Sequence, residues 1–146
     1  SATRVITDSF TANYLAMEGI EVVKSIVDEN ALGSGPWNQG ISERCYLVNY
    51  NSTRGGPTNW TVMTCPSFGS SLIDAGIAPL KFTPSSGLYS RQGGPASGFS
   101  PFYRMVHVIP EAGSLRYIKL ESVVAWIGRG GTRNEIVLED YLFDQK

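Results

Sequence analysis

Apolar residues recur at steps of three and four positions over about residues 7–30, which is the spacing of one face of an α-helix. Polar residues fill much of the other side, where Glu21 precedes Lys24 by three positions and can form a weak ion pair with it. The segment 33–36 contains Gly and Pro, which end helices. The sequence therefore predicts an amphipathic helix that must bury one face against another element. The apolar residues of that face are Leu15, Ala16, Ile20, Val23, Ile26 and Val27.

Beyond Pro36 the pattern changes to short runs of alternating apolar and polar residues, separated by segments rich in Gly, Ser and Pro. The first two runs are typical of an antiparallel pair, and the last three are typical of a meander joined by 110–114 and by the Gly-rich run 128–132. The sequence thus predicts strands over 45–50, 60–64, 80–83, 87–91, 102–109, 116–127 and 134–142.

The predicted strand 116–127 carries apolar residues at alternate positions, while Lys119 and Glu121 take the other parity. This pattern is expected for a sheet that is buried on one face, and the apolar stripe of the helix can cover that face. The chain has 146 residues, the length of one domain. We therefore predict a single α+β domain over 1–146, with a helix at about 7–30 packed on an antiparallel sheet formed within about 41–144.

Two cysteines, Cys45 and Cys65, are the only ones in the chain. A bond between them would close a loop of about twenty residues and contribute roughly 3 kcal/mol to stability. Such a disulfide would indicate an extracytoplasmic compartment. The alternative is a pair of unrelated buried thiols, since free cysteine is among the most buried residue types.

Charge and hydropathy leave the choice of partner open. Twelve Lys and Arg residues against thirteen Asp and Glu residues give a formal net charge of -1, so no long-range field favours nucleic acid or an anionic membrane as the main partner. No segment of the printed sequence approaches the roughly twenty apolar residues that are needed to span a bilayer.

The run Leu15-Ala16-Met17-Glu18-Gly19-Ile20-Glu21 resembles the part of the N-terminal helix that follows the membrane-spanning half in type IV pilin-like proteins, the minor pilins and pseudopilins. The resemblance extends to 102–108 followed by 118–126, and then to a basic turn at 129–133, an order that is similar to PilV-like minor pilins. It covers most of the chain. The chain departs from the family pattern in lacking the cleavage motif and in placing its cysteines in mid-chain.

The resemblance implies a pilin-like fold and a structural role as a minor pilin or pseudopilin of a type IV pilus or related surface filament. We expect a hydrophobic helix before Ser1 to have been removed from this soluble headgroup. That helix would anchor the subunit in the inner membrane before assembly and would contact other pilin subunits at the cell surface afterwards. The implied function has no catalytic step, no metal and no cofactor.

The resemblance also assigns roles along the helix. Val5, Ile6 and Phe10 are expected to contact neighbouring subunits, and the alternative is that they are frayed terminal residues. The residues expected to pack on the sheet and support assembly are Leu15, Ile20, Val23, Ile26 and Val27.

An enzyme is not indicated. His107 is the only histidine, and the sequence has neither a Gly-x-Ser-x-Gly elbow nor metal ligands at a recognisable spacing. The run 128–131 lies between two predicted strands and lacks the ending of a phosphate-binding loop, so a hairpin turn is the better interpretation. Asp140 and Asp144 match no calcium-binding loop, and we expect them to be solvated.

Two further interpretations stay open. Tyr89, Arg91, Arg129 and Arg133 could contact a ligand or single-stranded DNA by stacking and charge, although the near-zero net charge favours solvated loops. The chain could instead be a freestanding secreted binding module, a small adhesin or a carbohydrate-binding domain. Its ligand would then meet the loops of 85–100 and exposed aromatic residues such as Trp37, Trp60 or Tyr89.

Overall fold

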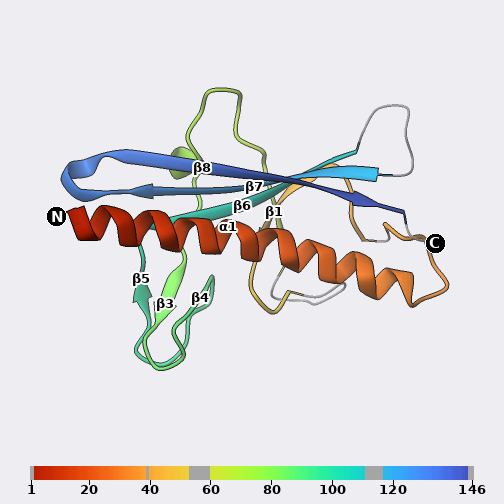
Figure 1. Ribbon diagram of the computed structural model, residues 1–146, viewed down its shortest axis with the longest axis horizontal. Helices are drawn as coiled ribbons and strands as arrows, with labels where there is room; N and C mark the ends of the chain where they lie inside the picture. Colours follow the sequence, from red (N-terminus) through yellow and green to blue (C-terminus); the bar gives the residue numbers. More distant parts are fainter. Residues whose placement is uncertain (1, 39, 53–59, 111–116, 145–146) are drawn as a thin grey trace.

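One long helix lies across one face of a five-stranded antiparallel sheet (Figure 1). The computed structural model describes residues 2–38, 40–52, 60–110 and 117–144. The helix α1 spans Ala2–Ala31, and the sheet has the order β2-β1-β6-β7-β8. Its strands are β1 (Arg44–Val48), β2 (Trp60–Met63), β6 (Phe102–Pro110), β7 (Tyr117–Ile127) and β8 (Arg133–Phe143). The predicted α+β class is confirmed.

A second, smaller sheet is formed between β2 and β6 in the chain and has the order β4-β3-β5. Its strands β3 (Lys81–Thr83), β4 (Leu88–Ser90) and β5 (Gly98–Phe99) form a separate unit beside α1 (Figure 1). The short 3-10 helices η1 (Leu72–Asp74) and η2 (Arg129–Gly131) lie before β3 and between β7 and β8.

The element boundaries differ little from the predicted ones. The helix begins five residues before its predicted start, because the residues before Thr7 include no helix breaker. All seven predicted strands are present with their ends within two residues, and only the short strand β5 was not predicted. Of the predicted connection 110–114, residues 111–114 lie outside the described part. None of the helices in the described ranges combines the length and apolar character needed to span a bilayer.

The inner face of α1 and the facing side chains of the large sheet form the main core. Val106 on β6 is paired with Ser122 on β7, which is paired with Leu138 on β8, so the residues that face α1 alternate in a common register. The structure buries the helix residues for which packing was expected, together with Ala12 and Ala16. These buried residues are Leu15, Ile20, Val23, Ile26 and Val27.

The opposite face of the sheet has a small core of its own, which the sequence did not predict. Cys45, Met105 and Ala125 point away from α1 and pack against Leu72 of η1. The disulfide between Cys45 and Cys65, with a Cα–Cα distance of 5.3 Å, lies at the edge of this cluster, so the predicted bond is confirmed. The segment around η1 therefore covers part of the face that α1 leaves open.

Gly19 lets α1 approach the sheet closely. A Cβ atom built on Gly19 would lie 2.5 Å from Ser122 Oγ and 3.1 Å from Val106 Cγ2, both of which belong to the sheet. A larger side chain at this position therefore requires the Ser122 side chain, the helix or the sheet to shift. Ser122 is itself completely buried, and its hydroxyl has no hydrogen-bond partner within the described residues.

We expect Gly19→Ala to lower the free energy of unfolding by about 1 kcal/mol, because the overpacking cost exceeds the gain in helix propensity. Ser122→Ala should be neutral or slightly stabilising, since it removes a buried hydroxyl that makes no hydrogen bond. The double variant should recover most of the loss. Urea unfolding of the four proteins measures the coupling, and additive effects would show that the two positions do not clash.

Candidate functional site: the outer face of the helix

The face of α1 that turns away from the sheet carries an exposed apolar stripe. Its members follow one another at steps of four, four and three positions, so they lie on one side of the helix. The exposed fractions are 69% for Ile6, 79% for Phe10, 49% for Tyr14 and 59% for Met17. We call these four residues the outer stripe.

The outer stripe occupies only the first half of α1. Further along the same face the exposed residues are polar, namely Glu21, Ser25 and Asp28. A single helix thus has an apolar inner face along most of its length and an apolar outer face in its N-terminal half. Exposed apolar surface of this kind is typical of contact with another molecule.

The three residues expected to meet neighbouring subunits do not all lie on one side. Ile6 and Phe10 belong to the outer stripe, whereas Val5 lies on the other side of the helix and lines a pocket near the turn between β7 and β8. All three lie within α1, which begins at Ala2. Tyr14 and Met17 were not predicted, although their helical spacing from Phe10 is visible in the sequence.

Arg104 connects α1 to the sheet through hydrogen bonds. Its side chain is fully buried, and its guanidinium Nη1 donates to the backbone oxygen of Leu15 (3.1 Å) and to Glu18 Oε1 (2.6 Å). Nη2 donates to the backbone oxygen of Val48 on β1 (2.8 Å). One side chain therefore joins α1, β6 and β1.

The charge on Arg104 is balanced by Glu18. Burial lowers the pKa of the Arg104 guanidinium from its ordinary value, and the nearby carboxylate of Glu18 opposes this shift. Glu18 also accepts a hydrogen bond from the hydroxyl of Tyr14 (3.1 Å), and the charge of Glu18 raises the pKa of Tyr14. The buried ion pair is thus connected directly to the outer stripe.

A second ion pair joins the C-terminal half of α1 to β8. Lys24 Nζ lies 2.8 Å from Asp140 Oδ2 on β8 and 3.8 Å from Glu21 Oε1. The hydrogen bond with Lys24 lowers the pKa of Asp140. Asp140, expected to be solvated, is therefore half-exposed and paired with a helix residue. An exposed pair of this kind contributes little to stability.

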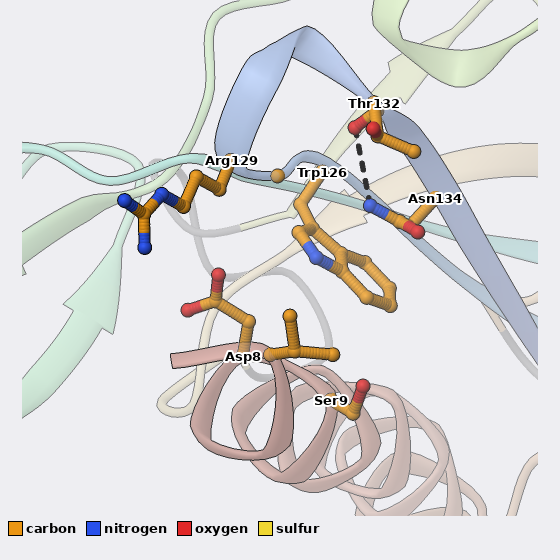
Figure 2. Close-up of a pocket in the computed structure, with 8 residues that line it drawn as sticks. Asp8, Ser9, Trp126, Arg129, Thr132 and Asn134 are labelled. Carbon is orange, nitrogen blue, oxygen red and sulfur yellow. Dashed lines mark hydrogen bonds between the residues drawn. The ribbon is translucent and has the colours of Figure 1, made fainter. Parts of the chain in front are cut away.

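A surface pocket of about 240 Å³ lies beside the start of α1. Figure 2 shows Asp8 and Ser9 facing it from α1, while Trp126 forms a wall between the helix and Asn134. The Asp8 carboxylate and the Arg129 guanidinium lie on the same side of the Trp126 indole (Figure 2). Trp126 is only 5% exposed and packs in the core with Phe102, so little of its ring is accessible to a ligand. Polar groups of both charges at one pocket suit a small polar ligand.

The four residues considered for ligand or DNA contact have four different sets of partners. Tyr89 is partly buried against Phe82 and Phe102, with ring centroids 4.9 and 6.0 Å away. The other three are arginines with polar neighbours. Arg91 donates to Thr61 Oγ1 (2.5 Å), Arg133 pairs with Asp74 (2.6 Å), and Arg129 lines the pocket of Figure 2. Among the described residues, these contacts do not link the four side chains to one another.

The aromatic residues that a binding module would expose include Trp37 and Trp60. Trp37 is only 8% exposed, so the expectation that it is exposed is wrong. It packs in the main core cluster with residues of α1 and the sheet, and Asn30 at the end of α1 donates to the backbone oxygen of Trp37 (2.9 Å). The side chain of Trp60 lies outside the described part of the structure.

Comparison of the chain with protein-family models, with curated proteins and with solved structures gave no match.

Proposed function

We propose that this chain is the head domain of a type IV pilin-like subunit, a minor pilin or pseudopilin, that assembles into a surface filament through α1. The observation that supports this proposal is the distribution of apolar residues on the helix. The inner face of α1 is buried by the subunit's own sheet, whereas the outer stripe is apolar and has no cover within the described residues.

The outer stripe indicates where the contact would form. A filament that assembles through helices buries apolar helix faces against one another, and burial of a large side chain contributes about 1.5–3 kcal/mol. Phe10 is the most exposed member of the outer stripe. The polar residues on the second half of the same face would remain at the filament surface or contact solvent.

The proposal includes the environment of the subunit. We propose that the helix continues into the inner membrane before assembly and joins other pilin subunits afterwards, at the cell surface. The disulfide is consistent with such an extracytoplasmic location, where thiol pairs remain oxidised. In this proposal the protein carries out no chemical reaction and requires no cofactor.

Phe10→Glu in the full-length protein tests the proposed contact. The new carboxylate would have to be buried without a partner, so the amount of subunit in sheared filaments should fall by at least about tenfold. The free energy of unfolding of the head domain should change by less than about 0.5 kcal/mol, because Phe10 is exposed in the subunit. Immunoblots of the membrane and sheared-filament fractions give the measurement.

Ser25→Glu is the matched control for Phe10→Glu. It places the same charge on the polar half of α1, and Ser25 is exposed. This variant should enter filaments as the unchanged protein does. Normal incorporation of Phe10→Glu, with the domain folded, would contradict assembly through the outer stripe.

A second candidate function is a freestanding binding module, and the pocket beside α1 favours it. Arg129 and Asn134 offer hydrogen-bond donors beside the largely buried Trp126, and such donors suit a sugar or another small polyol. Titration with neutral mono- and disaccharides, followed by tryptophan fluorescence, tests this function. A saturable change that Arg129→Ala abolishes would support a binding module. An absence of change at millimolar sugar would reject it.

A further inference from the structure

The disulfide has a histidine neighbour that is far away in the sequence. The Sγ atoms of Cys45 and Cys65 and a ring nitrogen of His107 all lie within 4.8 Å of one another. Ligand atoms that share one metal ion lie about 2.0–2.3 Å from it, so they are at most about 4.6 Å apart. The two sulfur atoms are bonded to each other in this structure, so they must move apart on reduction to reach the spacing of metal ligands, whereas the ring of His107 already lies beside both. The sequence did not reveal this cluster because its members come from three separated segments.

Cys45 and His107 lie on paired strands of the sheet, whereas Cys65 lies on the connection that follows β2. Cys45 on β1 is the register partner of His107 on β6, so the two side chains lie next to each other on the same face of the sheet. Cys65 comes two residues after the end of β2 and is exposed. A small movement of this connection is enough to separate the two sulfur atoms once the bond between them is reduced.

A thioether and a carboxylate lie near the two cysteines and His107. A cavity of about 120 Å³ is lined by both cysteines, His107 and the thioether residue Met105. Glu121 Oε1 lies 3.5 Å from His107 Nδ1. The Glu121 carboxylate adds negative charge beside the ring, which favours a bound cation. Thiolate and thioether sulfur select soft metal ions such as Cu(I).

We propose that the reduced form of this protein binds one Cu(I) ion through Cys45, Cys65 and His107, with Met105 beside the site. Reduction breaks the bond between the two sulfur atoms with two electrons and two protons, supplied by a dithiol that itself becomes a disulfide. Binding of Cu(I) then releases the two thiol protons, because the sulfur ligands coordinate as thiolates.

The redox state of the cysteine pair controls the site. In the oxidising compartment proposed above, the disulfide form is the resting one, and only a dithiol reductant converts it to the metal-binding form. Disulfide sulfur carries no negative charge and is a far poorer ligand than thiolate. The oxidised protein is thus a closed, metal-free form, and the reduced protein is the metal-binding form. This site faces away from α1, and it does not depend on the proposed assembly through the helix.

The test uses protein that has been reduced with dithiothreitol, desalted without oxygen and titrated with Cu(I) held by bicinchoninate. The reduced chain should take one Cu(I) from the indicator, and the oxidised chain should take none. His107→Ala should weaken the binding of Cu(I) by at least about tenfold. Ile109→Ala, which changes the same face of the same strand without removing a ligand, is the matched control and should bind as the unchanged chain does.

Two results would overturn the proposal. One is equal affinity of the reduced His107→Ala and unchanged chains, which would leave only a dithiol site. The other is equal uptake of Cu(I) by the oxidised chain, which would exclude the cysteines as ligands. If reduction loosens the fold, thermal unfolding replaces the titration, and Cu(I) should then raise the melting temperature of the reduced chain more than that of reduced His107→Ala. An equal rise would also count against the site.

Discussion

Arg104→Met is expected to lower the free energy of unfolding by about 3–5 kcal/mol, the range found when one partner of a buried ion pair is removed. The change leaves Glu18 without its cation and leaves the backbone oxygen of Val48 without the guanidinium donor. Part of the Glu18 carboxylate reaches solvent, since 14% of its side chain is exposed, so we expect the lower end of this range. Urea unfolding followed by circular dichroism measures the difference.

A second substitution separates the ion pair from the packing of the arginine stem. Arg104→Met combined with Glu18→Leu replaces both charged groups by apolar ones and should recover much of the loss, because no unpaired charge then remains. Arg129→Met is the control, since Arg129 is exposed and should tolerate the change within about 0.5 kcal/mol. A small effect of Arg104→Met alone would show that the buried guanidinium is not needed to hold α1 on the sheet.

Removing the disulfide should cost nearly as much. The double variant Cys45→Ala, Cys65→Ala opens a loop of 20 residues, for which the chain-entropy relation gives roughly 3 kcal/mol. Most of the effect acts on the unfolded chain, which gains conformational freedom. Cys45 is also completely buried, so the missing sulfur adds a small packing cost at its contacts with Leu72 and Met105.

Reduction of the unchanged protein provides an independent measurement of the disulfide. Urea unfolding in dithiothreitol should give a free energy close to that of the double variant, because both proteins lack the cross-link. The double variant itself should show no dependence on dithiothreitol. If the reduced and oxidised proteins unfold at the same urea concentration, the bond does not restrict the unfolded chain as expected.

The features that the sequence predicted well are those with a local pattern. The three- and four-residue period of α1 and the alternation in β7 identify which faces are buried, because each side chain's direction follows from backbone geometry. The disulfide was predictable because the chain has only one pair of cysteines. The helical period, the strand alternation and the single cysteine pair can all be read from the sequence without knowing which distant segments are in contact.

The features that were missed depend on contacts between distant segments. Arg104 shares the parity of Phe102 and Val106, so its buried position was visible in the pattern, but its partner Glu18 is 86 residues away. The cluster of Cys45, Cys65 and His107 likewise forms only when β1 and β6 pair. Trp37 was expected on the surface. Its packing in the core and the hydrogen bond from Asn30 to its backbone oxygen have no signature in the sequence.

The direction of α1 has a mechanical consequence. The helix lies along the long strands β6, β7 and β8, and its contacts with them extend over most of its length (Figure 1). Tension applied to the N-terminal end of α1 along its axis would load these contacts in shear, so they would have to rupture together instead of turn by turn. The guanidinium of Arg104, bonded to α1 and to β1, would carry part of that load. Such a load would therefore be shared between the helix and the sheet.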